Sequence, residues 1–140
     1  MEKLSYWERD YASRLEKYIA DEHYSGALYA ALARRCEGRQ AAMLRAMSAD
    51  EARHLRAMQM EYYLLTGDSL RCADADVAGD SCELLRGAYA GEAEAAEGYA
   101  REARLCADEE LKKLYMAQSA DEWRHRANVK KILGSALGLE

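Results

Sequence analysis

The heptapeptide SADEARH, residues 48–54, recurs as SADEWRH at residues 119–125. Each copy contains Glu-x-x-His, and residues three apart on a helix share one face, with their Cβ atoms about 5–6 Å apart. A carboxylate and an imidazole placed in this way can bind one metal ion together. Two of the chain's three histidines lie in these copies. The repeat therefore predicts two helices that each carry a metal-binding pair, Glu51 with His54 and Glu122 with His125.

The repeat extends upstream of both copies. Three residue types precede each copy at intervals of seven residues: Glu22, Tyr29 and Cys36 in the first half, and Glu92, Tyr99 and Cys106 in the second. The glutamates interrupt apolar helical stripes, whereas an unpaired glutamate is almost never buried. Two divalent cations would supply the four positive charges that four buried carboxylates need. The chain therefore looks like two related halves that hold metal.

The composition predicts a single all-α domain over residues 1–140. The chain has no proline and is rich in alanine, leucine, glutamate and arginine, which favour long helices. Valine and isoleucine are too scarce to build a sheet. The apolar spacing predicts four helices: one from a cap at Ser5 to Gly38, one over residues 40–66, one from a cap at Asp80 to Cys106, and one after Asp108, with Gly134 and Gly138 loosening the tail.

The connector after residue 67 decides the predicted topology. If the second and third helices are parallel, residues 67–81 must cover roughly 39 Å at 1.5 Å of helix rise per residue. An extended chain of that length reaches about 46 Å. Antiparallel neighbours would need only a few residues. The sequence therefore favours one long crossover between the second and third helices.

This ligand pattern resembles the ferritin-like di-iron and di-manganese carboxylate bundles, and most closely their rubrerythrin-like branch. In such bundles two helices give one Glu each and two others give a Glu-x-x-His each. The resemblance covers roughly residues 15–133 and implies a ferritin-like four-helix bundle that binds two metal ions, iron or manganese. It implies these roles: Glu51 and Glu122 bridge the ions, Glu22 and Glu92 bind terminally, and His54 and His125 each complete one ion's shell.

Asp50 and Asp121 precede the two bridging candidates. A metal-bound imidazole usually donates its second N–H to a carboxylate, and the two aspartates are the predicted acceptors. The alternative is that they form exposed ion pairs with Arg53 and Arg124, three residues further on.

Tyr29 and Tyr99 lie two helical turns beyond Glu22 and Glu92 on the same face. They are the candidate catalytic residues, as hydrogen-bond donors to a ligand carboxylate. The alternative is that they are core aromatic residues with a satisfied hydroxyl. Cys36 and Cys106 are predicted to be small buried apolar residues.

The sequence also predicts where the protein works. The net charge of −5 argues against a nucleic-acid partner, and no apolar run approaches the ~20 residues of a membrane span. The first residues lack the features of a signal peptide, so a soluble cytoplasmic protein is expected. In that compartment a disulfide between Cys72 and Cys82 is disfavoured. Because no Cys-x-x-Cys pair is present, any electron donor must be external.

The resemblance implies a di-iron oxidoreductase that reduces hydrogen peroxide or oxygen. Rubrerythrins, however, carry one more ligand glutamate a turn after the third-helix Glu, where this chain has Ala95. Two alternatives stay open: a ferroxidase or iron-handling protein, and a metal-binding helical bundle without enzymatic activity. A homodimer is also expected, because Tyr6, Trp7 and Tyr24 occupy exposed positions of the first helix and aromatic residues are enriched at interfaces.

Overall fold

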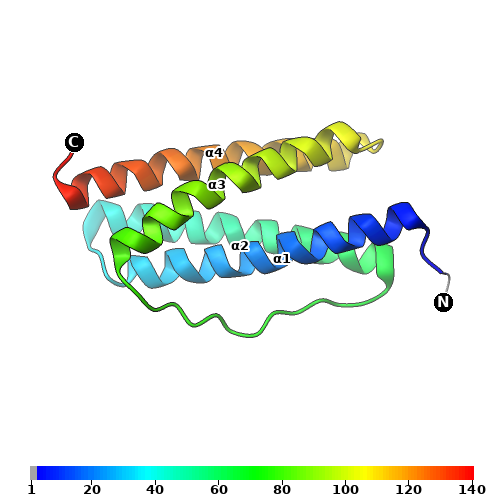
Figure 1. Ribbon diagram of the computed structural model, residues 1–140, viewed down its shortest axis with the longest axis horizontal. Coiled ribbons are helices and arrows are strands. Elements are labelled where there is room, and N and C mark those ends of the chain that lie inside the picture. The colour runs from blue at the N-terminus through cyan, green and yellow to red at the C-terminus, as the bar shows by residue number, and fades with distance from the viewer. Residues whose placement is uncertain (1–2) are drawn as a thin grey trace. The chain divides into compact units, whose positions relative to one another are not determined.

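A computed structural model describes residues 3–140. These residues form four α-helices and no strands, which confirms the predicted all-α class (Figure 1): α1 Tyr6–Ala33, α2 Gly38–Thr66, α3 Ser81–Leu105 and α4 Glu109–Leu137. The chain divides into two compact units, the first ending at Val77 and the second beginning at Ala78. Each predicted half of the repeat thus forms its own unit. The first residues, in which no signal peptide is predicted, include residues 1 and 2, and these two lie outside the described residues.

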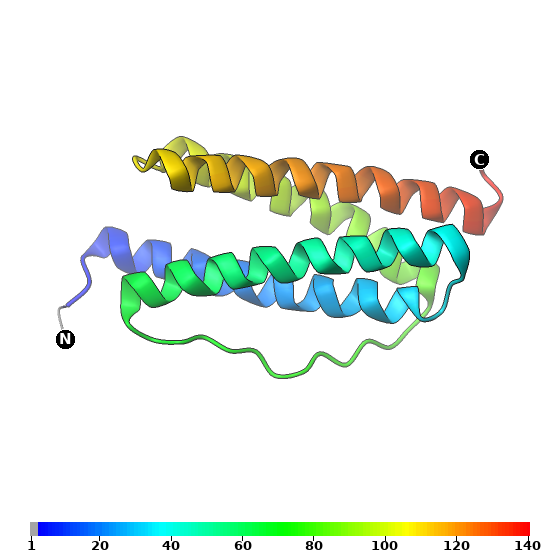
Figure 2. The same ribbon diagram turned by 180° about the vertical axis from the view of Figure 1, so that it is seen from behind.

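The first unit is an antiparallel pair of helices, α1 and α2, which lie side by side in both views (Figures 1 and 2). The Ser48 hydroxyl donates to the carbonyl of Gly26 at 2.8 Å, and the Tyr62 hydroxyl donates to Glu16 Oε1 at 3.3 Å. The hydrogen-bonded residues are further apart in sequence at one end of the helix pair than at the other, as antiparallel packing requires. The core of this unit includes apolar side chains that are at most 1% exposed: Leu15, Ile19, Leu32, Leu44, Met47 and Met58.

The second unit repeats this plan with α3 and α4. The Ser119 hydroxyl donates to the carbonyl of Ala96 at 2.7 Å. Ser119 and Ala96 are the repeat counterparts of Ser48 and Gly26, so the same interhelical hydrogen bond is made twice. The internal repeat of the sequence is therefore a repeat of local structure as well.

The structure confirms the helix caps predicted at Ser5 and Asp80. Ser5 and Glu8 form a complete capping box at the start of α1. Asp80 accepts from the backbone N–H of Glu83 at the start of α3, and Asp108 does the same for Leu111 at the start of α4, both at 3.0 Å. Gly67 ends α2 in the left-handed conformation with φ 80°, a conformation that costs glycine nothing.

Three predictions about helix ends are wrong. Gly38 has a positive φ of 60° but begins α2, because α1 stops at Ala33 in a tight turn that leaves Cys36 outside the helix. Cys106 follows α3 as its C-cap residue, so neither cysteine lies on a buried helical stripe and both are half-buried. Gly134, which was predicted to loosen the tail, lies within α4, and the helix continues to Leu137.

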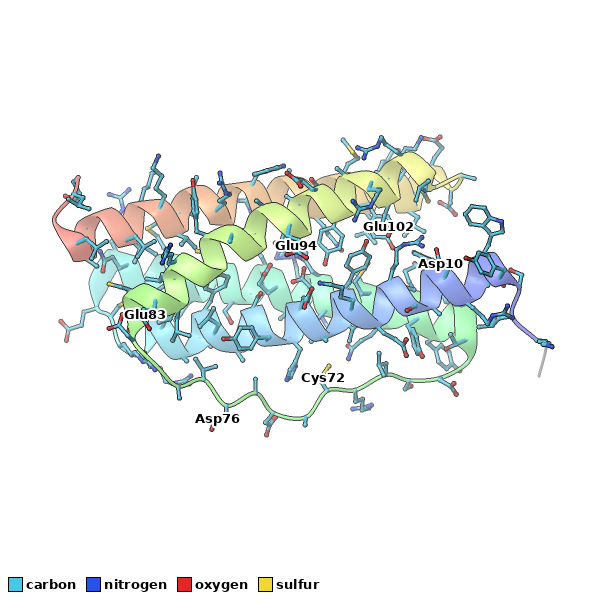
Figure 3. All side chains as sticks on the ribbon, in the orientation of Figure 1. Asp10, Cys72, Asp76, Glu83, Glu94 and Glu102 are labelled. Atoms are coloured by element: carbon cyan, nitrogen blue, oxygen red, sulfur yellow. The ribbon has the colours of Figure 1, made fainter. Side chains whose placement is uncertain are left out.

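The connector runs back along the first unit. The Gln59 amide donates to the carbonyl of Leu70 at 3.0 Å, and His23 Nε2 lies 2.8 Å from the carbonyl of Ala73, so Nε2 carries the proton and donates. Within three residues, from Leu70 to Ala73, the connector thus passes from Gln59 of α2 to His23 of α1. Such a step requires an extended chain. Figure 3 shows Cys72 on this segment.

Among residues 3–140, none of the helices combines the length and the apolar character that crossing a lipid bilayer requires.

Candidate metal centre

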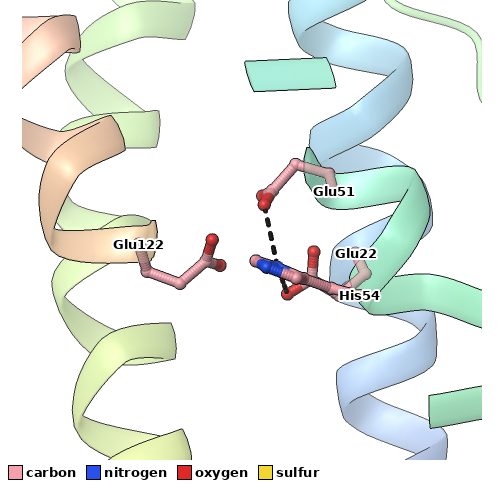
Figure 4. Close-up of side chains that lie close together, drawn as sticks. All are labelled: Glu22, Glu51, His54 and Glu122. Carbon is pink, nitrogen blue, oxygen red and sulfur yellow. Dashed lines mark ion pairs between the residues drawn. The ribbon is translucent and has the colours of Figure 1, made fainter. Parts of the chain in front are cut away.

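The first unit holds a buried triad of Glu22 from α1 with Glu51 and His54 from α2. His54 Nδ1 lies 3.4 Å from Glu22 Oε1 and 3.2 Å from Glu51 Oε1 (Figure 4). One ligand atom from each of the three residues lies within 4.8 Å of the other two. The three side chains are 2%, 0% and 3% exposed. The Glu-x-x-His spacing aligns two ligands on α2, and the antiparallel packing brings the third from α1.

The second unit holds the equivalent triad, Glu92 from α3 with Glu122 and His125 from α4. His125 Nδ1 lies 3.5 Å from Glu92 Oε2 and 3.3 Å from Glu122 Oε1. The ligand atoms again lie within 4.8 Å of one another, and the side chains are 3%, 1% and 0% exposed. The two triads therefore agree in composition, in ring orientation and in burial.

The donor set of each triad fits a divalent metal ion. Two carboxylates and one imidazole offer hard oxygen ligands and one nitrogen ligand, a combination that suits iron, manganese or zinc. Burial of two carboxylates without a counter-charge is costly, and a divalent ion would neutralise both. Each buried cluster could thus hold a metal ion. Because both imidazoles turn Nδ1 towards the carboxylates, Nε2 is the nitrogen left for a supporting carboxylate.

The predicted supporting residues form ion pairs on the same helix. Arg53 Nη1 lies 2.7 Å from Asp50 Oδ1, and Arg124 Nη2 lies 2.9 Å from Asp121 Oδ1. Both arginine side chains are more than half exposed, whereas both aspartate side chains are 19% exposed. The ion-pair interpretation is thus observed. The role of the aspartates as acceptors for histidine stays a prediction.

The two candidate tyrosines are buried, as predicted. Tyr29 is 0% exposed and Tyr99 is 1% exposed. Tyr99 stacks against Tyr115 of α4 with ring centroids 6.0 Å apart and an interplanar angle of 27°. Their core position is confirmed, and their catalytic role stays a prediction. All four cysteines are free, so Cys72 and Cys82 form no disulfide, in agreement with the sequence analysis.

Two polar residues lie in the core of the second unit, and sequence reasoning missed the burial of one of them, Glu102. Glu102 of α3, labelled in Figure 3, is 3% exposed. Gln118 of α4 is 2% exposed, and within the described part of the chain neither its amide nitrogen nor its amide oxygen has a hydrogen-bond partner. Gln118 lies on the predicted inner stripe, one turn before Glu122, so its helical position was the available signal. Glu102 lies one turn after Tyr99, and glutamates at such positions usually face solvent.

No family model matches this sequence. The comparisons with curated proteins and with solved structures likewise return no significant match.

Proposed function

We propose that this protein is a dinuclear metal oxidoreductase that reduces hydrogen peroxide, or oxygen, in a ferritin-like, rubrerythrin-like four-helix bundle. One observation carries the proposal: two equivalent buried triads, each with a Glu and a Glu-x-x-His, occur in the two halves of one chain. This is the ligand set of the di-iron and di-manganese carboxylate bundles. Iron is the favoured metal, and manganese shares the same ligand preferences.

In the proposed arrangement the two triads serve two ions together. A triad supplies three ligands, fewer than the six that iron or manganese commonly takes, so sharing a carboxylate between ions helps to complete both shells. Glu51 and Glu122 are the proposed bridging ligands, with Glu22 and Glu92 terminal and one histidine on each ion. The long crossover between α2 and α3 belongs to this proposal. The extended path of the connector past Gln59 and His23 supports it.

Two bound ferrous ions would supply the two electrons that the reduction of hydrogen peroxide to two molecules of water requires, together with two protons. Reduction of oxygen to water requires four electrons, which one such pair does not hold. The four free cysteines include no Cys-x-x-Cys pair, so the electrons would be restored by an external donor. The chain's own contribution is a buried, tightly arranged ligand set. Tyr29 and Tyr99 would supply hydroxyl groups within the core.

Ala95 favours a second candidate, a ferroxidase in which Fe(II) is the substrate. The rubrerythrin-like pattern implies a further ligand glutamate at this position. Here a half-buried methyl group takes its place. Each half of the chain therefore supplies the same three candidate ligands and no additional carboxylate. A symmetric site without the additional carboxylate is compatible with oxidation of Fe(II) by oxygen.

Anaerobic loading with Fe(II), followed by stopped-flow mixing with hydrogen peroxide or with oxygen, separates these functions. The proposal predicts faster oxidation by peroxide and no continued turnover when excess Fe(II) is added. If oxygen reacts at least tenfold faster, about 1.4 kcal/mol in barrier, the ferroxidase or oxidase function replaces it. Metal that binds but reacts with neither oxidant indicates a non-enzymatic metal-binding bundle.

A further inference from the structure

The two halves of the repeat differ in the polarity of their cores. Outside the two triads, the buried polar or charged side chains of the described residues are Glu102, Gln118 and Ser119, all in the α3–α4 unit. The first unit has apolar residues at the positions equivalent to three inner residues of the second, each at most 1% exposed: Leu32 for Glu102, Leu44 for Tyr115 and Met47 for Gln118. At these three positions the polar side chain belongs to the α3–α4 unit.

These polar residues follow one another along the second unit. Gln118 lies one turn from Glu122, on the same face of α4. Tyr115 lies three residues before Gln118 in α4 and stacks on Tyr99 of α3. Glu102 lies one turn after Tyr99 in α3. At 1.5 Å per residue, the path from Glu92 to Glu102 is about 15 Å long. It leads from the triad towards the turn at residues 106–108, of which residues 107 and 108 are exposed.

Gln118 is the unexplained member of this set. Its two amide atoms are shielded from solvent, and neither has a hydrogen-bond partner among residues 3–140. A buried amide without hydrogen bonds lowers stability, so such groups are generally satisfied by ordered water or by a ligand. The equivalent Met47 has about the same size but no amide group that needs hydrogen-bond partners. A glutamine at this position is therefore costly to the fold unless it binds something.

We propose that the Gln118 amide binds a small neutral molecule that donates and accepts hydrogen bonds, one helical turn from Glu122. That molecule is water in the resting protein and hydrogen peroxide during turnover. The amide suits both, since its NH₂ group donates and its carbonyl oxygen accepts. The identity of the substrate rests on the proposed function, whereas the water-binding site does not require a metal.

The first test uses metal-free, ¹⁵N-labelled protein and needs no activity. A rotating-frame Overhauser experiment should give a dipolar cross peak between the side-chain amide protons of Gln118 and water, opposite in sign to chemical exchange. Loss of the amide signal in Gln118→Met verifies the assignment. Absence of the cross peak in wild-type protein overturns the proposal, because the amide then binds no water.

The second test measures the rate constant for hydrogen peroxide with iron-loaded, reduced protein. Gln118→Met should lower it about tenfold, the effect of losing about 1.4 kcal/mol of interaction, with unchanged metal content. An unchanged rate constant in Gln118→Met overturns the peroxide assignment even if water binds. If the protein takes up no metal, the proposed function fails, and the result of the first test still stands.

Discussion

His125 Nδ1 lies 3.5 Å from Glu92 Oε2, on the antiparallel neighbouring helix, and His54 Nδ1 lies 3.4 Å from Glu22 Oε1 in the other unit. Each contact joins the Glu-x-x-His of one helix to the lone glutamate of its neighbour. The same nitrogen is used in both units, so both imidazoles have the same orientation relative to their carboxylates. This equivalence is the strongest structural support for two related metal-binding half-sites.

Replacement of a bridging glutamate should remove more metal than replacement of a terminal one. Glu51→Ala and Glu122→Ala should each lose both ions, because a bridging carboxylate serves both, whereas Glu22→Ala should lose chiefly one. Elemental analysis after reconstitution measures the difference. Circular dichroism must first show that the helices are intact. Equal losses in Glu22→Ala and Glu51→Ala would remove the bridging assignment.

Gly26→Ala should stabilise the protein. A Cβ at Gly26 would lie 3.6 Å from Glu51 Cβ and 3.8 Å from the carbonyl of Ser48, which are ordinary contacts, and the equivalent Ala96 already carries one. Removing a glycine from a helix interior should add roughly 0.5–1 kcal/mol to the free energy of unfolding. Urea unfolding of metal-free protein measures the change. A clear loss of stability would mean that the space beside Glu51 is needed.

The capping box of α1 should make stability depend on acidity. The pKa of the Glu8 carboxyl lies below the ordinary 4.5. The larger cause is the hydrogen bond that the Ser5 backbone N–H donates to this carboxylate, and the smaller is the hydrogen bond with the Ser5 hydroxyl. Because the folded pKa is the lower one, this contribution is present above 4.5 and is lost as pH falls through the folded pKa.

Carbon-detected NMR titration of the Glu8 carboxyl measures that pKa directly. Ser5→Ala should move it towards 4.5 by removing the hydroxyl. Glu8→Gln should show a smaller loss of helicity than wild type between pH 5 and pH 3, the range in which a carboxyl of this kind titrates. A Glu8 pKa at or above 4.5 in the wild-type protein contradicts the prediction.

The protein should form a homodimer through the aromatic residues of α1. Tyr6 and Trp7 are 72% and 75% exposed, and Tyr24 is 44% exposed, so the exposure that the sequence analysis assumed is confirmed. Light scattering at micromolar concentration should give twice the chain mass of 15.8 kDa. Trp7→Glu should shift the protein towards monomer, whereas Leu137→Glu, an exposed position in the other unit, should not. A wild-type monomer would end this idea.

Much of the fold could be predicted because local signals agreed with one another. The caps at Ser5 and Asp80 and the stop at Gly67 are side-chain or backbone effects that act within one turn, and the structure has all three. The ends near Gly38 and Gly134 could not be predicted in this way. A glycine adopts both helical and left-handed conformations readily, so its presence alone does not decide whether a helix ends there.

The triads could be predicted because helical spacing and repetition both constrain them. Six ligand residues occupy positions that leave little freedom once the two helix pairs form. The inner position of Gln118 follows from the apolar stripe of its helix, whereas the burial of Glu102 could not be predicted, because glutamates at such positions usually face solvent. The structure alone shows that Glu102 is buried and that the Gln118 amide has no hydrogen-bond partner among residues 3–140.

The central claim is that one chain holds a coupled pair of metal ions. The most direct test is electron paramagnetic resonance of the iron-loaded protein, partially reduced to the mixed-valent state, with the iron content measured on the same sample. The account predicts two iron ions per chain and a spectrum of two antiferromagnetically coupled ions, lost in Glu51→Ala. One ion per chain, or two ions that give only the signal of isolated ferric iron, would contradict it.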